Sequence, residues 1–215
     1  VAEHLVPFLP GHSIFGSTQN QVSAAPFGSA GILPITYGYI RMMGTEGLTQ
    51  ATKIAILNAN YLAACRKDTY GIVYRGATGF VGHEMILECR KVHEETGISE
   101  NDIAKRLMDY GYHAPTLSFP VHGTLMIEPT ESESLAELDN FVDVMLNIWK
   151  EIQEVKNEEA DKNDNVLINA PHPEYEIVND NWEHSYTREK AAYPIESVRE
   201  NKFWVNVARV DNTLG

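Results

Sequence analysis

The stretch from Tyr110 to Glu133 constrains the fold and function of this 215-residue chain more than any other segment. It reads as one or two strands, but it also contains a dense set of polar and backbone-bending residues: His113, Pro115, Thr116, His122, Gly123, Thr124 and Glu128. Each of these residues taken singly is more often structural than catalytic. Their concentration in one segment between two predicted helices indicates the wall of a functional site.

Both flanking helices have strong end signals. Ser99 and Asp102 form the pattern of a capping box, and Gly111 supplies the left-handed residue that ends a helix. Ser134 and Glu137 suit a second capping box. The residues that follow Glu137 give an apolar stripe at helical spacing: Leu138, Phe141, Val142, Met145, Trp149 and Ile152. The sequence therefore predicts one helix beginning after Ser99 and another after Ser134.

Short apolar runs precede the first of these helices. Gly71–Tyr74 reads as a strand, and the alternating pattern of His83–Cys89 reads as its hairpin partner. His83 and Glu84 are neighbours on this strand, so their side chains are expected to point to opposite faces and not to touch. The pattern from Gly71 to Trp149 predicts an α/β unit: a small, mainly antiparallel sheet with helices packed on one face.

The N-terminal third contains the clearest long helix, Leu48–Arg66. It has apolar residues on two sides, which predicts burial between other elements. Gly31–Met43 is expected to become helical after Pro34. A loop of small residues precedes it, and Gly28 and Ser29 in that loop are candidates for holding a phosphate through exposed amides. Most loops of this composition are simple turns.

Three regions are predicted along the chain. Residues 1–66 carry the long helix, residues 67–160 form the small α/β domain, and residues 161–215 form a C-terminal tail. The tail has little periodicity, but its aromatic residues predict that it wraps around the rest: Trp182, Tyr186, Tyr193, Phe203 and Trp204.

Composition excludes several classes of function. The net charge of −13 argues against a nucleic-acid binder, which needs lysines and arginines to neutralise phosphates. Cys65 and Cys89 lack zinc-site spacing and are expected to be buried free thiols in a reducing compartment. No apolar run is long enough to span a bilayer. The first residue, Val1, lies within an apolar segment, which suggests a cut fragment or a processed product.

Several long runs of this sequence resemble the glycine decarboxylase family, the P-protein of the glycine cleavage system. The runs are collinear and cover essentially the whole chain: residues 4–12, 22–44, 47–63, 81–90, 102–133, 171–173 and 186–212. They include GYHAPTLSFPVHGT and YTREKAAYPIESVRENKFW. Chance similarity does not produce collinear matches of this length.

The resemblance implies a fold type I (aspartate-aminotransferase-like) enzyme that uses pyridoxal 5'-phosphate, of which residues 67–160 would be the C-terminal small domain. Such an enzyme decarboxylates glycine and passes the aminomethyl group to the lipoyl arm of the H-protein. It implies a homodimer or a split heterotetramer, in the bacterial cytoplasm or the mitochondrial matrix. Gly28 and Ser29 would then reach a neighbouring subunit's cofactor phosphate.

The resemblance also places the expected site. His113 and Thr116 would face the glycine–cofactor adduct or the access path of the lipoyl arm, and Glu128 would be a site carboxylate. The apolar and hydroxyl character around His113, Pro115, Thr116 and Phe119 suits a poorly hydrated pocket for the substrate carboxylate.

One departure from the family pattern matters. The family's cofactor lysine follows a histidine, and none of the eight histidines of this chain is followed by lysine. The chain alone is therefore expected to be inactive. Two other interpretations stay open: a non-catalytic module for dimerisation or partner docking, and a naturally separate short subunit.

Overall fold

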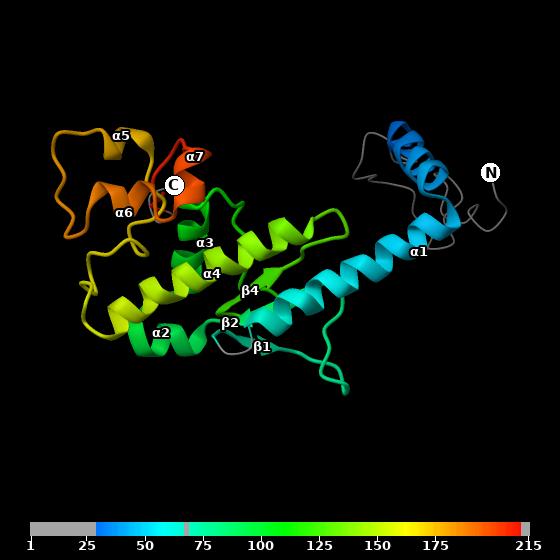
Figure 1. Cartoon of the computed structure of the whole chain (residues 1–215), viewed down its shortest axis with the longest axis horizontal. Coiled ribbons are helices and arrows are strands. Elements are labelled where there is room, and N and C mark those ends of the chain that lie inside the picture. The colour runs from blue at the N-terminus through cyan, green and yellow to red at the C-terminus, as the bar shows by residue number, and fades with distance from the viewer. Residues whose placement is uncertain (1–28, 67–68, 212–215) are drawn as a thin grey trace, which may run out of the picture. The chain divides into compact units, whose positions relative to one another are not determined.

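The structure is a computed structural model that describes residues 29–66 and 69–211 (Figure 1). Contacts divide the chain into two units, residues 1–50 and residues 51–215. Gly28 lies outside the described residues. No described helix is long and apolar enough to cross a membrane. The domain limits at residues 66 and 160 stay predictions.

The N-terminal helical region begins with a 3-10 turn, η2 (Ala30–Ile32), and continues as helix α1 (Leu33–Arg66). Gly44 interrupts α1 with φ of 62° and ψ of −178°. Glycine adopts such a positive φ without the steric cost that a Cβ atom imposes. Element α1 thus contains two helical parts that meet at the non-helical Gly44, in agreement with the two helices predicted from the sequence.

The second half of α1 packs on one side only. Ala59, Leu62 and Ala63 are buried in the core of the larger unit. Leu57 is 66% exposed and Ile54 is 39% exposed. The prediction that this helix is buried on two sides is wrong for the described residues, because Ile54 and Leu57 of the second apolar stripe are exposed and only Tyr61 of that stripe is partly buried against the core.

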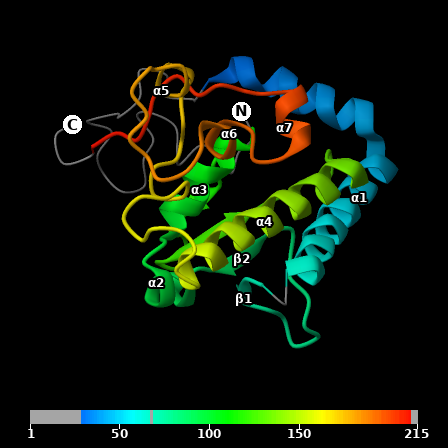
Figure 2. The same cartoon turned by 60° about the vertical axis from the view of Figure 1, so that its left-hand side comes forward.

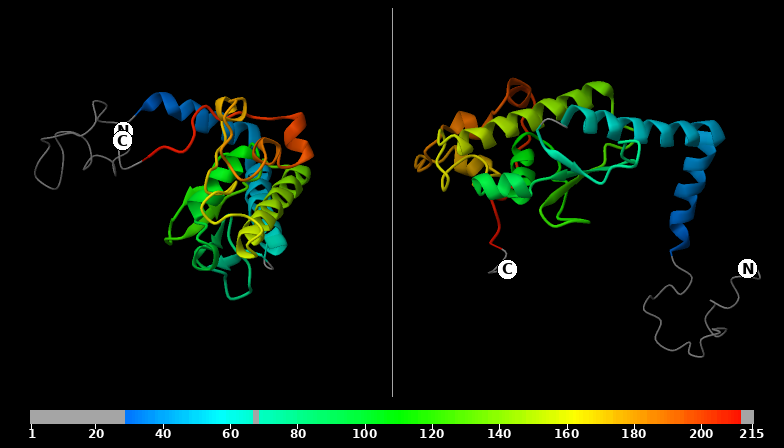
Figure 3. Two further views of the ribbon diagram at one scale, coloured as in Figure 1. Left: turned by 90° about the vertical axis from the view of Figure 1, so that its left-hand side faces the viewer. Right: turned by 90° about the horizontal axis from the view of Figure 1, so that it is seen from below.

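The larger unit contains a four-stranded sheet in the order β1-β2-β4-β3. The strands are β1 (Gly71–Val73), β2 (Met85–Glu88), β3 (Thr116–Leu117) and β4 (Thr124–Ile127). All neighbouring strands are antiparallel. The sequence-based prediction of a small antiparallel sheet is confirmed. Figure 3 shows the region of this sheet from two further directions.

Helices α2 (Arg90–Thr96), α3 (Glu100–Asp109) and α4 (Leu135–Lys156) complete the core of this unit. Ser99 and Asp102 form the predicted capping box, and Gly111 has the predicted left-handed φ of 87°. Sequence reasoning did not predict α2. The core gathers apolar side chains from the sheet and from all three helices: Leu87, Val92, Ile103, Leu107, Leu125, Met145 and Ile148.

The tail adds three short helices, α5 (Glu174–Ile177), α6 (Arg188–Ala192) and α7 (Glu196–Glu200), which Figure 2 shows near α3 and α4. Ala191 and Ala192 are fully buried. Further along, the Arg209 guanidinium donates a hydrogen bond to the carbonyl of Ala170, and it pairs with Asp102 on α3. The tail is thus tied to α3 by polar contacts.

Both cysteines are free thiols, as predicted. Cys89 is buried, and burial raises the pKa of its thiol to about 12. Cys65 is only half-buried. No group of three or more metal-ligand side chains occurs within residues 29–66 and 69–211.

Candidate functional site

A cavity of about 460 Å³ lies where the loop after α3, the end of β4 and the first turns of α4 meet. We call it the β4 cavity. Leu62 of α1 also lines it. The other lining residues are Tyr112, His113, Ala114, Pro115, Thr116, Met126, Ile127, Glu128, Pro129, Glu133, Glu137, Leu138 and Phe141. Most of them belong to the segment that sequence analysis singled out.

The structure brings His113, Thr116 and Glu128 together in the wall of the β4 cavity. Thr116 begins β3, where it is paired with Met126, and Glu128 follows the last residue of β4. All three residues are exposed. Their catalytic roles stay predictions, but they share one surface.

A histidine shortly after a helix can cap its last carbonyls, but His113 does not cap α3. The carbonyl of Leu107 accepts hydrogen bonds from the amides of Tyr110 and Tyr112, and the carbonyl of Met108 accepts one from Gly111. The backbone itself thus satisfies the end of the helix. No described residue forms a hydrogen bond or ion pair with the His113 imidazole, which leaves it available to a ligand.

Tyr112 is a cavity residue that sequence reasoning missed. Its hydroxyl donates to Glu137 Oε1 at 2.6 Å and accepts from Asn140 Nδ2 at 2.7 Å. Burial and the hydrogen bond to Glu137 raise the pKa of this phenol. Its ring packs edge-on against Phe141, with centroids 5.2 Å apart. The position between Gly111 and His113 was the only signal that could have indicated it.

Only one of the two hydrogen bonds of the second predicted capping box forms. The Ser134 hydroxyl accepts a hydrogen bond from the Glu137 amide at 3.2 Å, as predicted. The Glu137 carboxylate accepts the Tyr112 hydroxyl instead of bonding back to Ser134. The start of α4 therefore contributes a carboxylate to the cavity wall.

Other polar residues of the same segment lie elsewhere. His122 and Gly123 were expected in the middle of a strand, but they lie in the loop between β3 and β4. His122 contacts Ser118, whose hydroxyl donates to Glu100 Oε1 at 2.5 Å. At Gly123, φ is +76° and a Cβ atom would lie 2.5 Å from Arg90 Cγ, so glycine is required there for packing.

Phe119 is 60% exposed and does not line the cavity. This position does not suit the expected apolar pocket.

The prediction that the side chains of His83 and Glu84 do not touch is wrong. His83 and Glu84 do touch, with 3.9 Å between Nε2 and Oε2. They lie in a bend before β2, where the alternation of a strand does not apply.

Ser29 is exposed at the start of η2, and its carbonyl accepts a hydrogen bond from the Ile32 amide. Its contact with a phosphate stays a prediction, and Gly28 lies outside the described residues.

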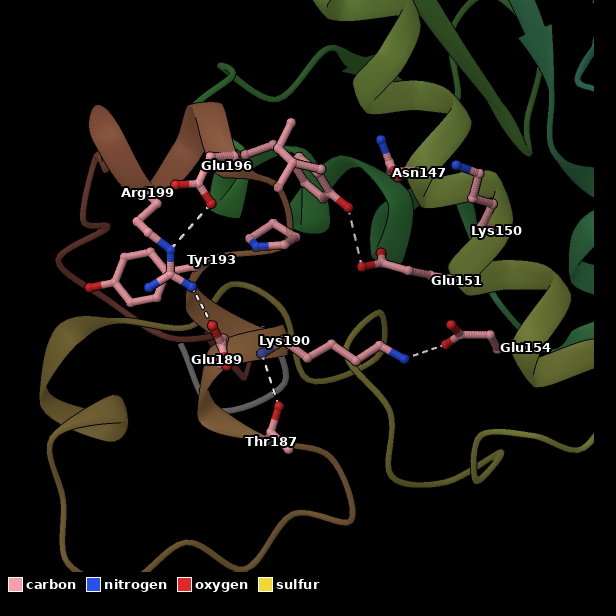
Figure 4. A pocket seen from close by; sticks show the side chains of 13 residues that line it. Asn147, Lys150, Glu151, Glu154, Thr187, Glu189, Lys190, Tyr193, Glu196 and Arg199 are labelled. Atoms are coloured by element: carbon pink, nitrogen blue, oxygen red, sulfur yellow. Dashed lines mark hydrogen bonds and ion pairs between the residues drawn. The ribbon is translucent and has the colours of Figure 1, made fainter.

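A second cavity, of about 500 Å³, lies between α4 and the tail, and we call it the tail cavity (Figure 4). Most of its charged side chains are paired. Lys190 reaches Glu154, and the Arg199 guanidinium lies between Glu189 and Glu196. This cavity is therefore polar but largely self-neutralised.

Behind the tail cavity lies a buried ionic cluster centred on Arg106, which is fully buried. Its five N–H groups donate to Glu151, Asp109 and the carbonyls of Lys190 and Ala191, at 2.7–3.0 Å. Burial disfavours the charged guanidinium, but Glu151 and Asp109 outweigh this effect and raise its pKa. The cluster therefore fastens the tail to α3 and α4.

Asp109 extends this cluster toward the tail. It accepts the backbone amide of His172 at 2.7 Å, and its Oδ2 lies 2.7 Å from His172 Nδ1. Burial opposes ionisation of Asp109, yet His172 and Arg106 hold the pKa of this carboxyl below its ordinary value. The other ring nitrogen of His172 lies 2.9 Å from the Tyr186 hydroxyl. No sequence pattern predicted this cluster.

Comparison with known protein families matches residues 51–172 to the family described as "Glycine dehydrogenase, C-terminal domain". The chain belongs to this family. The match includes the sheet, α2, α3, α4 and every residue that lines the β4 cavity. The resemblance inferred from the sequence is thereby confirmed.

Curated relatives extend the match over the whole chain. The glycine dehydrogenase (decarboxylating) of Bacteroides fragilis is 90% identical over 215 residues, which are all of this chain and 23% of the relative. The protein of the same description from Serratia proteamaculans is 58% identical over 220 residues, again 23% of its length. This member of the glycine dehydrogenase C-terminal domain family thus spans about a quarter of the curated relatives it matches.

Proposed function

We propose that this chain acts as the C-terminal part of an enzyme that decarboxylates glycine and transfers the aminomethyl group to the lipoyl arm of an H-protein. The observation that carries the proposal is the 90% identity, over the whole chain, to a glycine dehydrogenase (decarboxylating). Within that enzyme the sheet and its helices form the small domain of a fold type I pyridoxal-phosphate enzyme, with the helices on one face. The assembly is a homodimer or a split heterotetramer that includes the remainder of the P-protein.

The residues of the β4 cavity do not fit the cofactor itself. Among the described residues, no lysine lines the cavity to hold an aldehyde, and no arginine or lysine lines it to hold a phosphate. Glu128, Glu133 and Glu137 line it instead, and their charge repels a phosphate. The cofactor is therefore held by other parts of the longer protein, and we assign no step through it to this cavity.

The contribution of this chain is a set of polar groups on the wall of the site. The His113 imidazole has no partner among the described residues, so it is free to donate or accept a proton at a bound substrate. The Thr116 hydroxyl lies on the edge strand β3, where it can orient a ligand by hydrogen bonding. Glu128 follows the last residue of β4 and contributes a carboxylate to the same wall.

The test is the replacement His113→Ala in the full-length enzyme. We expect glycine–carbon dioxide exchange per folded molecule to fall by at least about tenfold, a loss of about 1.4 kcal/mol of transition-state stabilisation. The melting temperature should change little, because the imidazole makes no hydrogen bond or ion pair within the described structure.

The matched control is His122→Ala. His122 is also an exposed histidine of the same segment, but it lies outside the β4 cavity. Exchange should stay within about twofold of the parent enzyme. If His113→Ala leaves exchange intact and only lowers stability, the site lies elsewhere in the protein.

A further inference from the structure

The residues from Tyr112 to Pro115 connect α3 to β3 and belong to no helix or strand. Their side chains differ in burial. Tyr112 and Ala114 pack against the hydrophobic core, whereas His113 between them is exposed and lines the β4 cavity. No strand ladder fixes the backbone of such a segment, so the position of His113 depends on how firmly its neighbours are held.

Tyr112 is held by three contacts with one face of α4. Its hydroxyl donates to Glu137 Oε1 at 2.6 Å and accepts from Asn140 Nδ2 at 2.7 Å. Its ring packs edge-on against Phe141, with 5.2 Å between the ring centroids. Residues three and four positions apart lie on the same side of a helix, so the three partners form one surface. The Tyr112 side chain is therefore fixed both at its ring and at its hydroxyl.

The start of α4 indicates that the contact with Tyr112 replaces a local one. In α3 the capping box at Ser99 is complete, with both of its hydrogen bonds present. In α4 the Ser134 hydroxyl accepts the Glu137 amide, but the Glu137 carboxylate accepts the Tyr112 hydroxyl from 25 residues away along the chain. The carboxylate thus serves the loop between α3 and β3 in place of the cap.

We propose that Tyr112 is a positioning residue, whose hydroxyl holds this loop on α4 and thereby keeps the His113 imidazole at the wall of the β4 cavity. Consecutive Cα atoms are about 3.8 Å apart, so a Tyr112 fixed on α4 leaves His113 little freedom. This role rests on the proposed function, in which His113 acts on the bound substrate. A displacement of about 1 Å at an acting group can lower a rate by about a hundredfold.

The test is Tyr112→Phe in the full-length enzyme, because phenylalanine keeps the ring but removes both hydrogen bonds of the hydroxyl. We expect kcat of glycine–carbon dioxide exchange to fall by about threefold to tenfold, with KM for glycine within about twofold of the parent value. Added to His113→Ala, the same substitution should lower exchange by no more than about a further twofold, because both changes act through one imidazole.

Tyr61→Phe is the matched control. The Tyr61 hydroxyl also donates to a carboxylate of α4, that of Asp139, but Tyr61 does not line the β4 cavity. This variant should lower the melting temperature as Tyr112→Phe does and leave exchange per folded molecule within about twofold. A purely structural role of Tyr112 predicts the same unchanged exchange for both variants.

Two substitutions at Glu137 separate its hydrogen bond from its charge. Glu137→Gln keeps an oxygen that can accept the Tyr112 hydroxyl, so exchange should stay within about twofold of the parent enzyme. Glu137→Ala removes the acceptor and should repeat the loss of kcat seen in Tyr112→Phe. Equal losses in Glu137→Gln and Glu137→Ala would overturn the positioning role, because the charge and not the hydrogen bond would then matter.

A crystal structure of full-length Tyr112→Phe gives a measurement that does not depend on activity. We expect the His113 imidazole to be displaced from its place in the parent enzyme or to occupy more than one conformer. An unmoved imidazole would overturn the inference. Normal exchange in Tyr112→Phe, together with lost exchange in His113→Ala, would also overturn it but keep the proposed function. A displaced imidazole with normal exchange in His113→Ala would support the positioning contact and reject the proposed role of His113.

Discussion

The Arg106 cluster and the β4 cavity both contain several charged side chains. They differ in whether those side chains are buried and paired with other groups of the protein. All five N–H groups of Arg106 are satisfied at a position with no exposure. In the β4 cavity, Glu128 and Glu133 are exposed and have no partner among the described residues. The comparison separates charges that hold the structure together from charges that face a ligand.

Burial is the physical reason for the difference. A buried charge without a partner costs several kcal/mol, so the Arg106 cluster persists only because each group has partners. An exposed carboxylate is hydrated and needs no partner, so the β4 cavity can keep three of them at little cost. Substitutions should therefore affect stability in the first region and binding or activity in the second.

The largest expected effect is that of Arg106→Met in the cluster. The substitution leaves the buried Glu151 and Asp109 carboxylates without their cation, and we expect unfolding to become easier by about 3–5 kcal/mol. Urea unfolding of the 215-residue chain, followed by tryptophan fluorescence, measures this change. Lys156→Met is the control, because the Lys156–Glu95 pair is 44% and 54% exposed. The control should cost less than about 1 kcal/mol. Equal losses of unfolding free energy in the two variants would contradict the distinction between the buried cluster and exposed ion pairs.

A smaller effect should separate the two helix caps. Ser99→Ala removes a hydroxyl from a complete capping box and should cost about 1–2 kcal/mol. Ser134→Ala removes only the forward half of a cap, since the Glu137 carboxylate bonds to Tyr112, and should cost about 0.5–1 kcal/mol. The same unfolding experiment compares them. A larger loss at Ser134 would mean that the start of α4 is built for stability, like the start of α3.

The smallest expected effect is a pH dependence from Lys202, which donates to the Asp109 carbonyl at 2.7 Å. Burial lowers the pKa of this lysine to about 8. Between pH 8 and the ordinary lysine pKa of about 10.4, the unfolded chain binds more protons than the folded chain, so stability rises with pH. We expect a gain of at most about 1 kcal/mol over this range, because the ammonium is partly exposed.

Lys202→Met supplies the comparison for that measurement. The difference in unfolding free energy between the parent chain and this variant should change between pH 8 and pH 10. A difference that stays constant across the range would show that Lys202 has an ordinary pKa and does not belong to the buried cluster.

Local signals in the sequence predicted much of the fold. The capping box at Ser99 and the stop at Gly111 depend on neighbouring residues, and the structure contains both. Helix α2 was not predicted. It is short, and its cap residue Cys89 makes no side-chain capping bond, so no strong signal marks its start.

The site was harder to predict because it depends on contacts between distant residues. His113, Thr116 and Glu128 were predicted from their density in one segment, and they do share a cavity. Tyr112 was missed because its role depends on Glu137 and Asn140, which lie 25 and 28 residues away along the chain. The Arg106–Glu151 pair spans 45 residues and was missed for the same reason. Spacing patterns do not report such contacts.

The most direct test of this account measures exchange and stability together in the full-length enzyme for His113→Ala and Arg106→Met. The account predicts that His113→Ala lowers glycine–carbon dioxide exchange per folded molecule by at least about tenfold with an unchanged melting temperature. It predicts that Arg106→Met lowers the melting temperature and leaves exchange per folded molecule within about twofold. The reverse pattern, with exchange lost in Arg106→Met and kept in His113→Ala, would contradict the assignment of the β4 cavity as the functional surface.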